Sequence, residues 1–325
     1  MNLHSNRDAF QALLSRVSER VDIREDILEK DYYVTLLLSE LAEKQGTLPA
    51  YFKGGTALYK AIGEMKRFSE DIDLTVEVSD CTTPSQGLKR LKAATQGYLQ
   101  LRRATDRSGE EDRRGSITTV YEYKPVVAVD TRDALQRFGS VKIEATSFTV
   151  SDPHEPLEIA PLLFLEATPE EQNLLSSKYG VIPFNIETMK IERIFADKVF
   201  AAEFYYQRHD LAQVAKHTYD LVVMMEQAKI KKLLSSPDQF TEMLNYKRRE
   251  EEVRIGSDLS SKPFSEFAVL NRIAKDREIG PEYQKMQRMY VFNDDNMVPF
   301  PEVVASIQDL RRCLLNLDQN TGTKQ

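Results

Sequence analysis

The sequence contains few cysteines and few histidines. Only Cys81 and Cys313 are present, far apart and outside any C-x-x-C pair, which argues against a disulfide framework and a cysteine-based zinc site. The four histidines show neither the H-E-x-x-H spacing nor any other ligand-like set. We therefore expect inert thiols and no histidine-based metal centre.

Long apolar runs are also missing. The longest, "YYVTLLLSELA" at residues 32–42, is too short and too polar to cross a bilayer, and the N-terminus lacks a signal-peptide pattern. The sequence thus predicts a cytoplasmic protein without membrane contact.

An excess of positive charge is absent as well, since the formal net charge is −7. This argues against a general nucleic-acid coat, because neutralising phosphates requires clustered Lys and Arg. Two local basic runs nevertheless occur, at residues 88–114 and 229–249, and each alone is equally typical of a solvated helix or loop. Their members are Lys89, Arg90, Lys92, Arg102, Arg103, Arg107, Arg113 and Arg114, and then Lys229, Lys231, Lys232, Lys247, Arg248 and Arg249.

The familiar phosphate-binding loops are missing too: there is no G-x-x-x-x-G-K-[ST] and no G-x-G-x-x-G, nor a G-x-S-x-G elbow. What is present is "YFKGGTALYKAIG", where two glycines separate an expected strand from an expected helix at residues 56–62. Glycines at such a bend let the backbone approach a ligand, and the first helical N–H groups then face an anion. Taken alone, "GGT" is also typical of an ordinary turn.

The organisation along the chain predicts an α/β (α+β) fold followed by helices. With 325 residues, 41% hydrophobic and 29% charged, the chain can bury two cores. Apolar periodicity predicts two opening helices that end near Gly46, and helices at 84–103, 186–207 and 211–227. Strands are expected at 50–53, 71–78, 117–123 and 140–150.

Two aspartates follow the diglycine bend. Because alternate residues of a strand share a face, Asp71 and Asp73 project together while Ile72, Leu74 and Val76 point towards the core. Neighbouring carboxylates repel one another unless a cation or a proton lies between them, and hard oxygen ligands of this kind suit Mg²⁺. The bend and the acidic pair together predict a phosphate and metal site; the alternative is that D-x-D merely caps a strand.

This order of motifs resembles the nucleotidyltransferase superfamily of DNA polymerase β type. More specifically, "EKDYYVTLLLSEL", "FKGGTALYKA", "RFSEDIDL" and "ADKVFA" resemble the AbiEii/AbiGii toxin family, the toxin half of bacterial abortive-infection toxin–antitoxin systems, which includes the MenT toxins. The matching segments run from residue 29 to residue 221, and the last hundred residues add nothing comparable.

The resemblance implies a polymerase β-like nucleotidyltransferase domain with a mixed sheet and flanking helices at residues 1–182. A mainly helical domain at 183–325 would contribute to the active site. Such enzymes use Mg²⁺, here as a two-ion site, to move a nucleoside monophosphate from an NTP to an RNA acceptor, in MenT-like members the tRNA 3′ end, which blocks translation. A winged-helix antitoxin encoded nearby would be the partner. Protein nucleotidylation, kinase-like phosphoryl transfer and silent nucleotide binding remain alternatives.

The resemblance also assigns residues. Gly54, Gly55, Thr56 and Ser69 would bind the nucleotide, and Asp71 and Asp73 the metal. A third metal-binding carboxylate is Glu144, which shares a strand face with Lys142 and Thr146 in "VKIEATSF"; a glutamate on an exposed strand face is also unremarkable.

Lys198 falls inside the apolar arc of the helix containing "IERIFADKVFAA". A lysine there must extend its ammonium to solvent or pair with an anion. The resemblance places a motif lysine here, so we expect catalytic contact with the triphosphate.

Two further polar groups lie on these helices. Periodicity places Lys216, His217 and Asp220 on a solvated stripe, whereas the resemblance makes Asp220 a site residue. Arg193 and Asp197, four residues apart, are expected to form a helix-surface pair, and the alternative is that they frame the site.

Overall fold

The computed structural model describes residues 1–63, 66–107, 109–113, 115–128, 139–148, 152–254 and 256–322. The chain divides into two compact units. The first comprises Met1–Gly63, Phe68–Ser147 and His154–Met189, and the second comprises Glu64–Arg67, Phe148–Pro153 and Lys190–Gln325. The main change of unit therefore comes between Met189 and Lys190, and the domain boundary predicted from the sequence lies between residues 182 and 183.

The first unit combines helices with strands. Its helical segments are η1 (Leu3–Ser5), α1 (Arg7–Val21), α2 (Glu25–Gln45), α3 (Gly54–Ala57), the π-helical η2 (Leu58–Ile62), α4 (Pro84–Thr95), α5 (Leu162–Leu165) and α6 (Pro169–Tyr179). Its strands are β1 (Ala50–Lys53), β2 (Ile72–Val76), β3 (Arg102–Arg103), β4 (Glu111–Arg113), β5 (Ser116–Glu122), β6 (Ser140–Thr146), β7 (His154–Ile159) and β8 (Phe184–Met189). The two opening helices and the strand at "AYFK" are confirmed.

The described strands form one mixed sheet in the order β3-β5-β6-β2-β1-β8-β7, with β4 also paired to β5. β2 runs antiparallel to β1 and parallel to β6, and β1 runs parallel to β8. In β6, Val141, Ile143 and Ala145 are fully buried while Lys142 and Glu144 are partly exposed, so the predicted alternation is confirmed. The predicted direction of the apolar side chains of β2 is confirmed in the same way.

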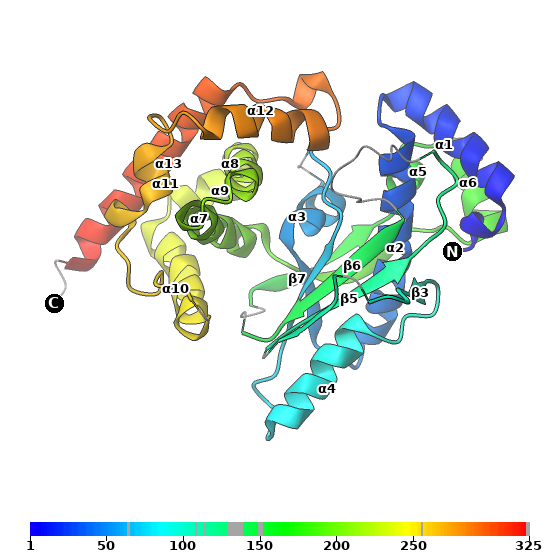
Figure 1. The fold of residues 1–325 in the computed structure, drawn as a ribbon, viewed down its shortest axis with the longest axis horizontal. Coiled ribbons are helices and arrows are strands. Elements are labelled where there is room, and N and C mark those ends of the chain that lie inside the picture. Colours follow the sequence, from blue (N-terminus) through cyan, green and yellow to red (C-terminus); the bar gives the residue numbers. More distant parts are fainter. Residues whose placement is uncertain are drawn as a thin grey trace. The chain divides into compact units, whose positions relative to one another are not determined.

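Helices α2 and α4 pack on the apolar face of this sheet (Figure 1). α2 is buried on every side from Ile27 to Leu38, which identifies it as the central helix of the unit. α4 begins with a capping box between Thr83 and Gln86 and with Pro84 at its first position. The polar face of β6 thus lies opposite the helical layer.

Two predicted helices are wrong in extent. α4 ends at Thr95 instead of residue 103, because Gly97 adopts a left-handed φ of +75° and the chain returns as β3. The helix expected from residue 186 begins only at Ile191, after strand β8. Ile186 and Met189 are both buried, and their spacing of three suits a first helical turn as well as a short strand buried on both faces.

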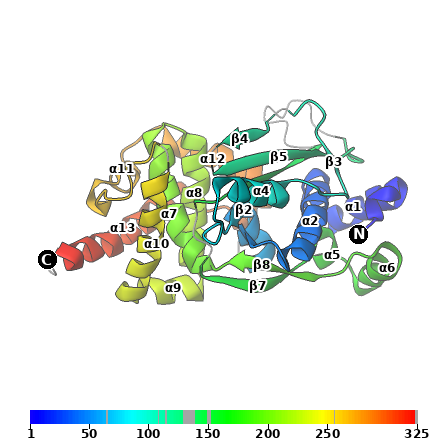
Figure 2. The ribbon, with the colours of Figure 1, turned by 90° about the horizontal axis from the view of Figure 1, so that it is seen from below.

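The second unit is mainly helical, as expected. It contains α7 (Ile191–Gln207), α8 (Leu211–Met225), α9 (Ala228–Leu234), α10 (Pro237–Val253), η3 (Phe264–Glu266), α11 (Ala268–Arg272), α12 (Ile279–Tyr290), η4 (Asp294–Asn296) and α13 (Phe300–Gly322). α7 and α8 lie side by side, with α10 against α7 and α12 against α8 (Figure 2). Among the described helices, none has the length and apolar composition needed to cross a membrane.

Candidate active site

The diglycine bend touches the acidic strand directly. Gly54 follows β1, opens α3 and has a φ of +80°. A Cβ atom at this position would lie 2.0 Å from Oδ2 of Asp73, so only glycine leaves room for that carboxylate. The β1 to β2 register, in which Lys53 pairs with Asp73, creates this proximity. The geometry explains why a glycine precedes the D-x-D motif along the chain.

Thr56 ties the same helix to the acidic segment. Its side chain is buried, and its hydroxyl donates a 2.5 Å hydrogen bond to the backbone carbonyl of Asp71. The hydroxyl is therefore already used, and its predicted contact with phosphate stays a prediction. Ser69 is partly buried in the irregular segment just before Asp71.

Glu144 lies beside Asp73 across the sheet. The two residues are register partners in the parallel pair of β2 and β6. Burial raises the pKa of the Glu144 carboxyl to about 7, and the negative charges of Asp73 and Asp71 add to the shift, while the ammonium of Lys142 opposes it. Three predicted metal-site carboxylates thus lie near enough to repel one another.

The carboxylates fit a divalent ion that takes part of its coordination from elsewhere. Among the described residues, no three His, Cys, Asp or Glu side chains converge tightly enough to hold an ion by themselves. Mg²⁺, however, typically binds one or two protein carboxylates together with water and substrate phosphates. The mutual repulsion at Glu144 is the kind of strain that such a cation relieves. Asp71, Asp73 and Glu144 are therefore the residues that could hold Mg²⁺.

Three consecutive charged residues of α2 support this site, and sequence reasoning missed them. Glu29, Lys30 and Asp31 are all buried. Glu29 accepts hydrogen bonds from the backbone N–H groups of residues 126 and 127, and Lys30 lies 3.9 Å from the carboxylate of Glu70, which directly precedes the acidic pair. The signal was present in "EKDYYVTLLL", where three charges stand inside an otherwise apolar helical run.

Asp31 forms a buried ion pair. Its carboxylate accepts a 2.5 Å hydrogen bond from the ammonium of Lys60 and a 2.9 Å bond from the Tyr59 hydroxyl, and both charged side chains are completely buried. The backbone N–H of Leu162 donates to the other carboxylate oxygen. Lys60 lies in η2, which continues directly from α3. A buried ion pair thus anchors the helical segment that begins at Gly54.

A separate charged cluster lies in the second unit. Arg67 donates to both carboxylate oxygens of Asp220 at 2.6 Å, and the ammonium of Lys198 lies 2.9 Å from Asp220 Oδ2. Burial opposes ionisation, but the two cations outweigh it and hold the pKa of Asp220 well below its usual range. The solvated-stripe interpretation of Asp220 is therefore wrong. The contact of Lys198 with a triphosphate stays a prediction, and its ammonium is here paired with Asp220.

The neighbours of Asp220 on α8 are also in contact with side chains. His217 stacks on Tyr205 with a 5.3 Å centroid distance, and Lys216 lies 4.1 Å from the ring centroid of Tyr290. Burial, followed by the charge of Lys198, lowers the pKa of His217 well below its usual value. His217 is therefore neutral at neutral pH.

Arg193 and Asp197 do pair, at 2.5 Å, but not on a surface. The Arg193 side chain is completely buried and also binds Glu250 of α10. Lys247, from the second basic run, lies 2.7 Å from Glu251 and 3.1 Å from Glu250. The expectation of an exposed helix pair is wrong, because α10 covers this side of α7.

The basic runs are largely neutralised by their own surroundings. In the first, Arg90 pairs with Asp80, Lys92 with Asp112, Arg103 with Glu110 and Arg113 with Glu111, while Arg114 lies outside the described residues. In the second, Lys231 pairs with Glu226, and Arg248 donates to backbone carbonyls. Most of the described cations of these runs are therefore already engaged within the protein.

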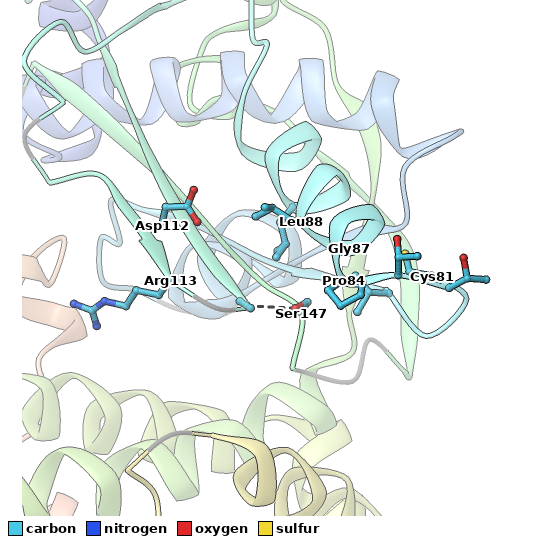
Figure 3. A pocket seen from close by; sticks show the side chains of 12 residues that line it. Cys81, Pro84, Gly87, Leu88, Asp112, Arg113 and Ser147 are labelled. Carbon is cyan, nitrogen blue, oxygen red and sulfur yellow. Dashed lines mark hydrogen bonds between the residues drawn. The ribbon is translucent and has the colours of Figure 1, made fainter.

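A cavity of about 570 Å³ opens beside the ends of β2 and β6 (Figure 3). Its walls come from the first turns of α4, including Pro84 and Leu88, and from the β4–β5 hairpin, including Asp112 and Arg113. Ser147, just after β6, donates a 3.4 Å hydrogen bond to the carbonyl of residue 115 across one wall. The three metal-site carboxylates are not among its described lining residues.

Comparison with solved structures gives a distant match. A chain described as the "Crystal structure of JHP933 from Helicobacter pylori" shares 16% sequence identity, with a TM-score of 0.31, over 88% of this chain and 93% of that one. No curated protein matches the chain significantly.

A family model gives a decisive match. The model of the "Nucleotidyl transferase AbiEii toxin, Type IV TA system" matches residues 36–312 and extends well past residue 221, where the recognisable motifs end. Most of the second unit is therefore part of the family's pattern. The chain belongs to the AbiEii family of nucleotidyltransferase toxins of type IV toxin–antitoxin systems.

Proposed function

We propose that this toxin transfers a nucleoside monophosphate from an NTP to the 3′-hydroxyl of an RNA, with tRNA as the acceptor, in a Mg²⁺-dependent reaction. The observation that carries the proposal is the contact between the diglycine bend and the acidic strand, where Gly54 leaves space for the carboxylate of Asp73. The site requires a phosphate-binding bend and a metal-binding carboxylate to be neighbours.

The protein's own groups have distinct tasks in this reaction. The first N–H groups of the helix at Gly54, Gly55 and Thr56 have no partner within the helix and would bind the β and γ phosphates. Asp71, Asp73 and Glu144 would hold Mg²⁺. When bound, the ion would neutralise charge on the phosphates and lower the pKa of the attacking hydroxyl.

The bond changes are those of a nucleotidyl transfer. The ribose oxygen of the acceptor forms a bond to the α-phosphorus and loses its proton, and the bond between the α-phosphorus and the bridging oxygen breaks. Pyrophosphate leaves with the electron pair. The 3′-hydroxyl of the original terminal nucleotide of the tRNA would then be part of a phosphodiester bond and could not accept an amino acid, so translation would stop.

The family implies an antitoxin as the partner. We expect a winged-helix protein encoded beside the toxin and a cytoplasmic site of action. Co-expression of the neighbouring gene should relieve growth arrest, and arrest that persists would contradict this partner.

A labelling experiment tests the reaction. The purified protein is incubated with Mg²⁺, total tRNA and NTPs labelled at either the α or the γ phosphate. Label from the α position alone should enter RNA, and Asp73→Asn should abolish transfer. Asp80→Asn, an exposed aspartate of the same unit paired with Arg90, is the matched control and should stay active.

The same assay separates the alternatives. Transfer of the γ label indicates a kinase-like reaction, and an α label in protein instead of RNA indicates protein nucleotidylation. Nucleotide binding without any transfer indicates a silent site. Each of these results contradicts the proposed reaction.

A further inference from the structure

A groove of about 760 Å³ runs along the polar face of β3, β5 and β6 in the first unit. Cations in its wall are Arg102 of β3, Lys124 just after β5, and Lys142 of β6. Its volume is in the range of ordinary ligand sites. We call it the β5–β6 groove.

The strand register places this groove on the same face as the metal-site carboxylates. Lys142 precedes Glu144 by two residues on β6, so both side chains leave the same face, about 7 Å apart along the strand. Glu122 is the cross-strand register neighbour of Arg102 between β5 and β3, and Val120 is that of Lys142 between β5 and β6. The groove therefore extends the carboxylate site outward across the sheet.

The cations of the groove, which include Arg102 of the first basic run, differ from the other described members of that run that form ion pairs. Among the described residues, Arg102, Lys124 and Lys142 have no ion-pair partner, whereas four neighbouring cations each have an acidic one. The three cations outnumber Asp106 and Glu122, the two carboxylates of the lining. Charges of this kind are available to bind phosphates.

The backbone around Lys124 is also held in place. Arg7 donates hydrogen bonds to the carbonyls of Lys124 and Pro125, at 3.3 and 2.8 Å. The guanidinium adds a further positive charge next to the groove. This side of the groove is thus fixed to α1 as well as to β5.

The order of strands separates this groove from the nucleotide. The diglycine bend follows β1, the carboxylates lie at the start of β2 and on β6, and the groove lies on β6, β5 and β3. In-line transfer requires the attacking hydroxyl and the leaving pyrophosphate on opposite sides of the α-phosphorus. If the triphosphate binds at the bend, the acceptor hydroxyl would approach the α-phosphorus from the side where the groove lies.

We propose that the β5–β6 groove binds the single-stranded 3′ end of the acceptor RNA, with Arg102, Lys124 and Lys142 contacting its phosphates. This inference rests on the proposed nucleotidyl transfer to RNA and adds where the acceptor lies. Because the contacts are to phosphates, they position the strand without reading its sequence.

The test measures RNA binding separately from turnover. A short fluorescent single-stranded RNA with a free 3′-hydroxyl is titrated with the full-length protein, without NTP, at several salt concentrations. Arg102→Gln combined with Lys124→Gln should weaken binding about tenfold or more at low salt, and should reduce the salt slope by about 0.7 for each lost contact. The KM for RNA should rise while the KM for NTP stays unchanged.

The matched control removes two lysines of the first basic run that lie outside the groove. Lys89 and Lys92 lie on α4, which packs on the opposite face of the sheet. Lys89→Gln combined with Lys92→Gln should bind RNA like the wild type. Equal losses in both double variants, or none in the groove variant, would overturn the proposal.

The outcomes distinguish the groove from the reaction. Asp73→Asn should abolish transfer yet retain groove-dependent RNA binding. If the wild type transfers nucleotide to RNA but binds RNA no more tightly than the groove variant, the groove assignment falls and the proposed reaction stands. If the wild type transfers no nucleotide while its RNA binding still depends on Arg102 and Lys124, the proposed reaction falls and the groove assignment stands.

Discussion

A carbon atom added to the α-carbon of Gly54 would lie 2.0 Å from Oδ2 of Asp73 and 2.8 Å from its Cβ. The carboxylate thus occupies space that any other residue at Gly54 would take. The bend and the acidic strand constrain one another through this single contact. Asp73 also lies beside Glu144 in the sheet. A substitution at Gly54 that displaces the Asp73 carboxylate would therefore displace a residue of the predicted metal site.

Gly54→Ala should therefore damage activity more than stability. The added methyl group must displace the Asp73 carboxylate, and a misplaced catalytic group lowers kcat/KM by about a hundredfold or more. The left-handed backbone adds a cost of about 1–2 kcal/mol in the free energy of unfolding. Steady-state kinetics and urea denaturation measure the two effects.

Gly46→Ala is the matched control. Gly46 caps α2 with a helical φ of −57°, and a Cβ there meets nothing within 4 Å. This variant should keep full activity and unchanged or slightly greater stability. Normal kinetics in Gly54→Ala would contradict the role we give to the contact.

Glu144→Gln should change how stability depends on pH. The folded-state pKa of about 7 lies above that of an unfolded glutamate, so folding favours the protonated form. The stability that this group contributes is complete below the unfolded pKa and is lost as the pH rises towards 7. Without Mg²⁺, the glutamine variant should exceed the wild type by about 1–3 kcal/mol near pH 8 and match it near pH 4.

Added Mg²⁺ should remove much of that difference. A cation between the carboxylates favours their charged forms, so it stabilises the wild type at high pH and does less for the glutamine variant. Urea unfolding at several pH values, with and without Mg²⁺, gives both comparisons. Parallel pH profiles of the two proteins without Mg²⁺ would contradict the repulsion among these carboxylates.

The sequence predicted those parts of the site that depend on local spacing. The partly exposed positions of Asp73 and Glu144 follow from the two-residue period of a strand. Asp71 lies one residue before β2, so its predicted face shared with Asp73 stays a prediction. Glycine before a helix is likewise a local signal. These features need only neighbours along the chain, so a single sequence suffices to predict them.

Partners far apart in the sequence could not be predicted. Lys60 with Asp31, and Arg67 with Asp220, are buried pairs whose members come from different elements. Periodicity shows that a charge stands on an apolar helix face, but many distant residues could neutralise it. For Asp220 the outcome depends on the surrounding helices: Asp220 is buried, whereas Lys216 and His217 of the same predicted stripe are partly exposed.

Asp220→Asn should strongly destabilise the protein. The substitution leaves the buried cations of Arg67 and Lys198 without their counter-charge, a loss that typically costs about 3–5 kcal/mol. Glu226→Gln is the control, because its pair with Lys231 is exposed and should be worth less than about 1 kcal/mol. Chemical denaturation of both variants measures the loss in the free energy of unfolding. A loss in Asp220→Asn as small as that in Glu226→Gln would show that the buried cluster does not stabilise the protein.

A double-mutant cycle at Asp31 and Lys60 tests whether their buried pair holds the nucleotide helix. Each single change, Asp31→Asn or Lys60→Met, leaves one buried charge uncompensated and should cost about 3–5 kcal/mol in the free energy of unfolding. The double variant contains neither charge, so it should lose less than the sum of the single effects, by about 1–3 kcal/mol.

The same variants have a functional readout. Lys60 lies on the helical segment that begins at Gly54, so the single variants should bind NTP more weakly even at temperatures where they remain folded. The double variant should recover part of that affinity, because removing both charges lets the helix pack again. Fluorescence titration with a labelled NTP measures the affinity. Additive unfolding energies together with wild-type NTP affinity in both single variants would show that Asp31 and Lys60 do not position the bend.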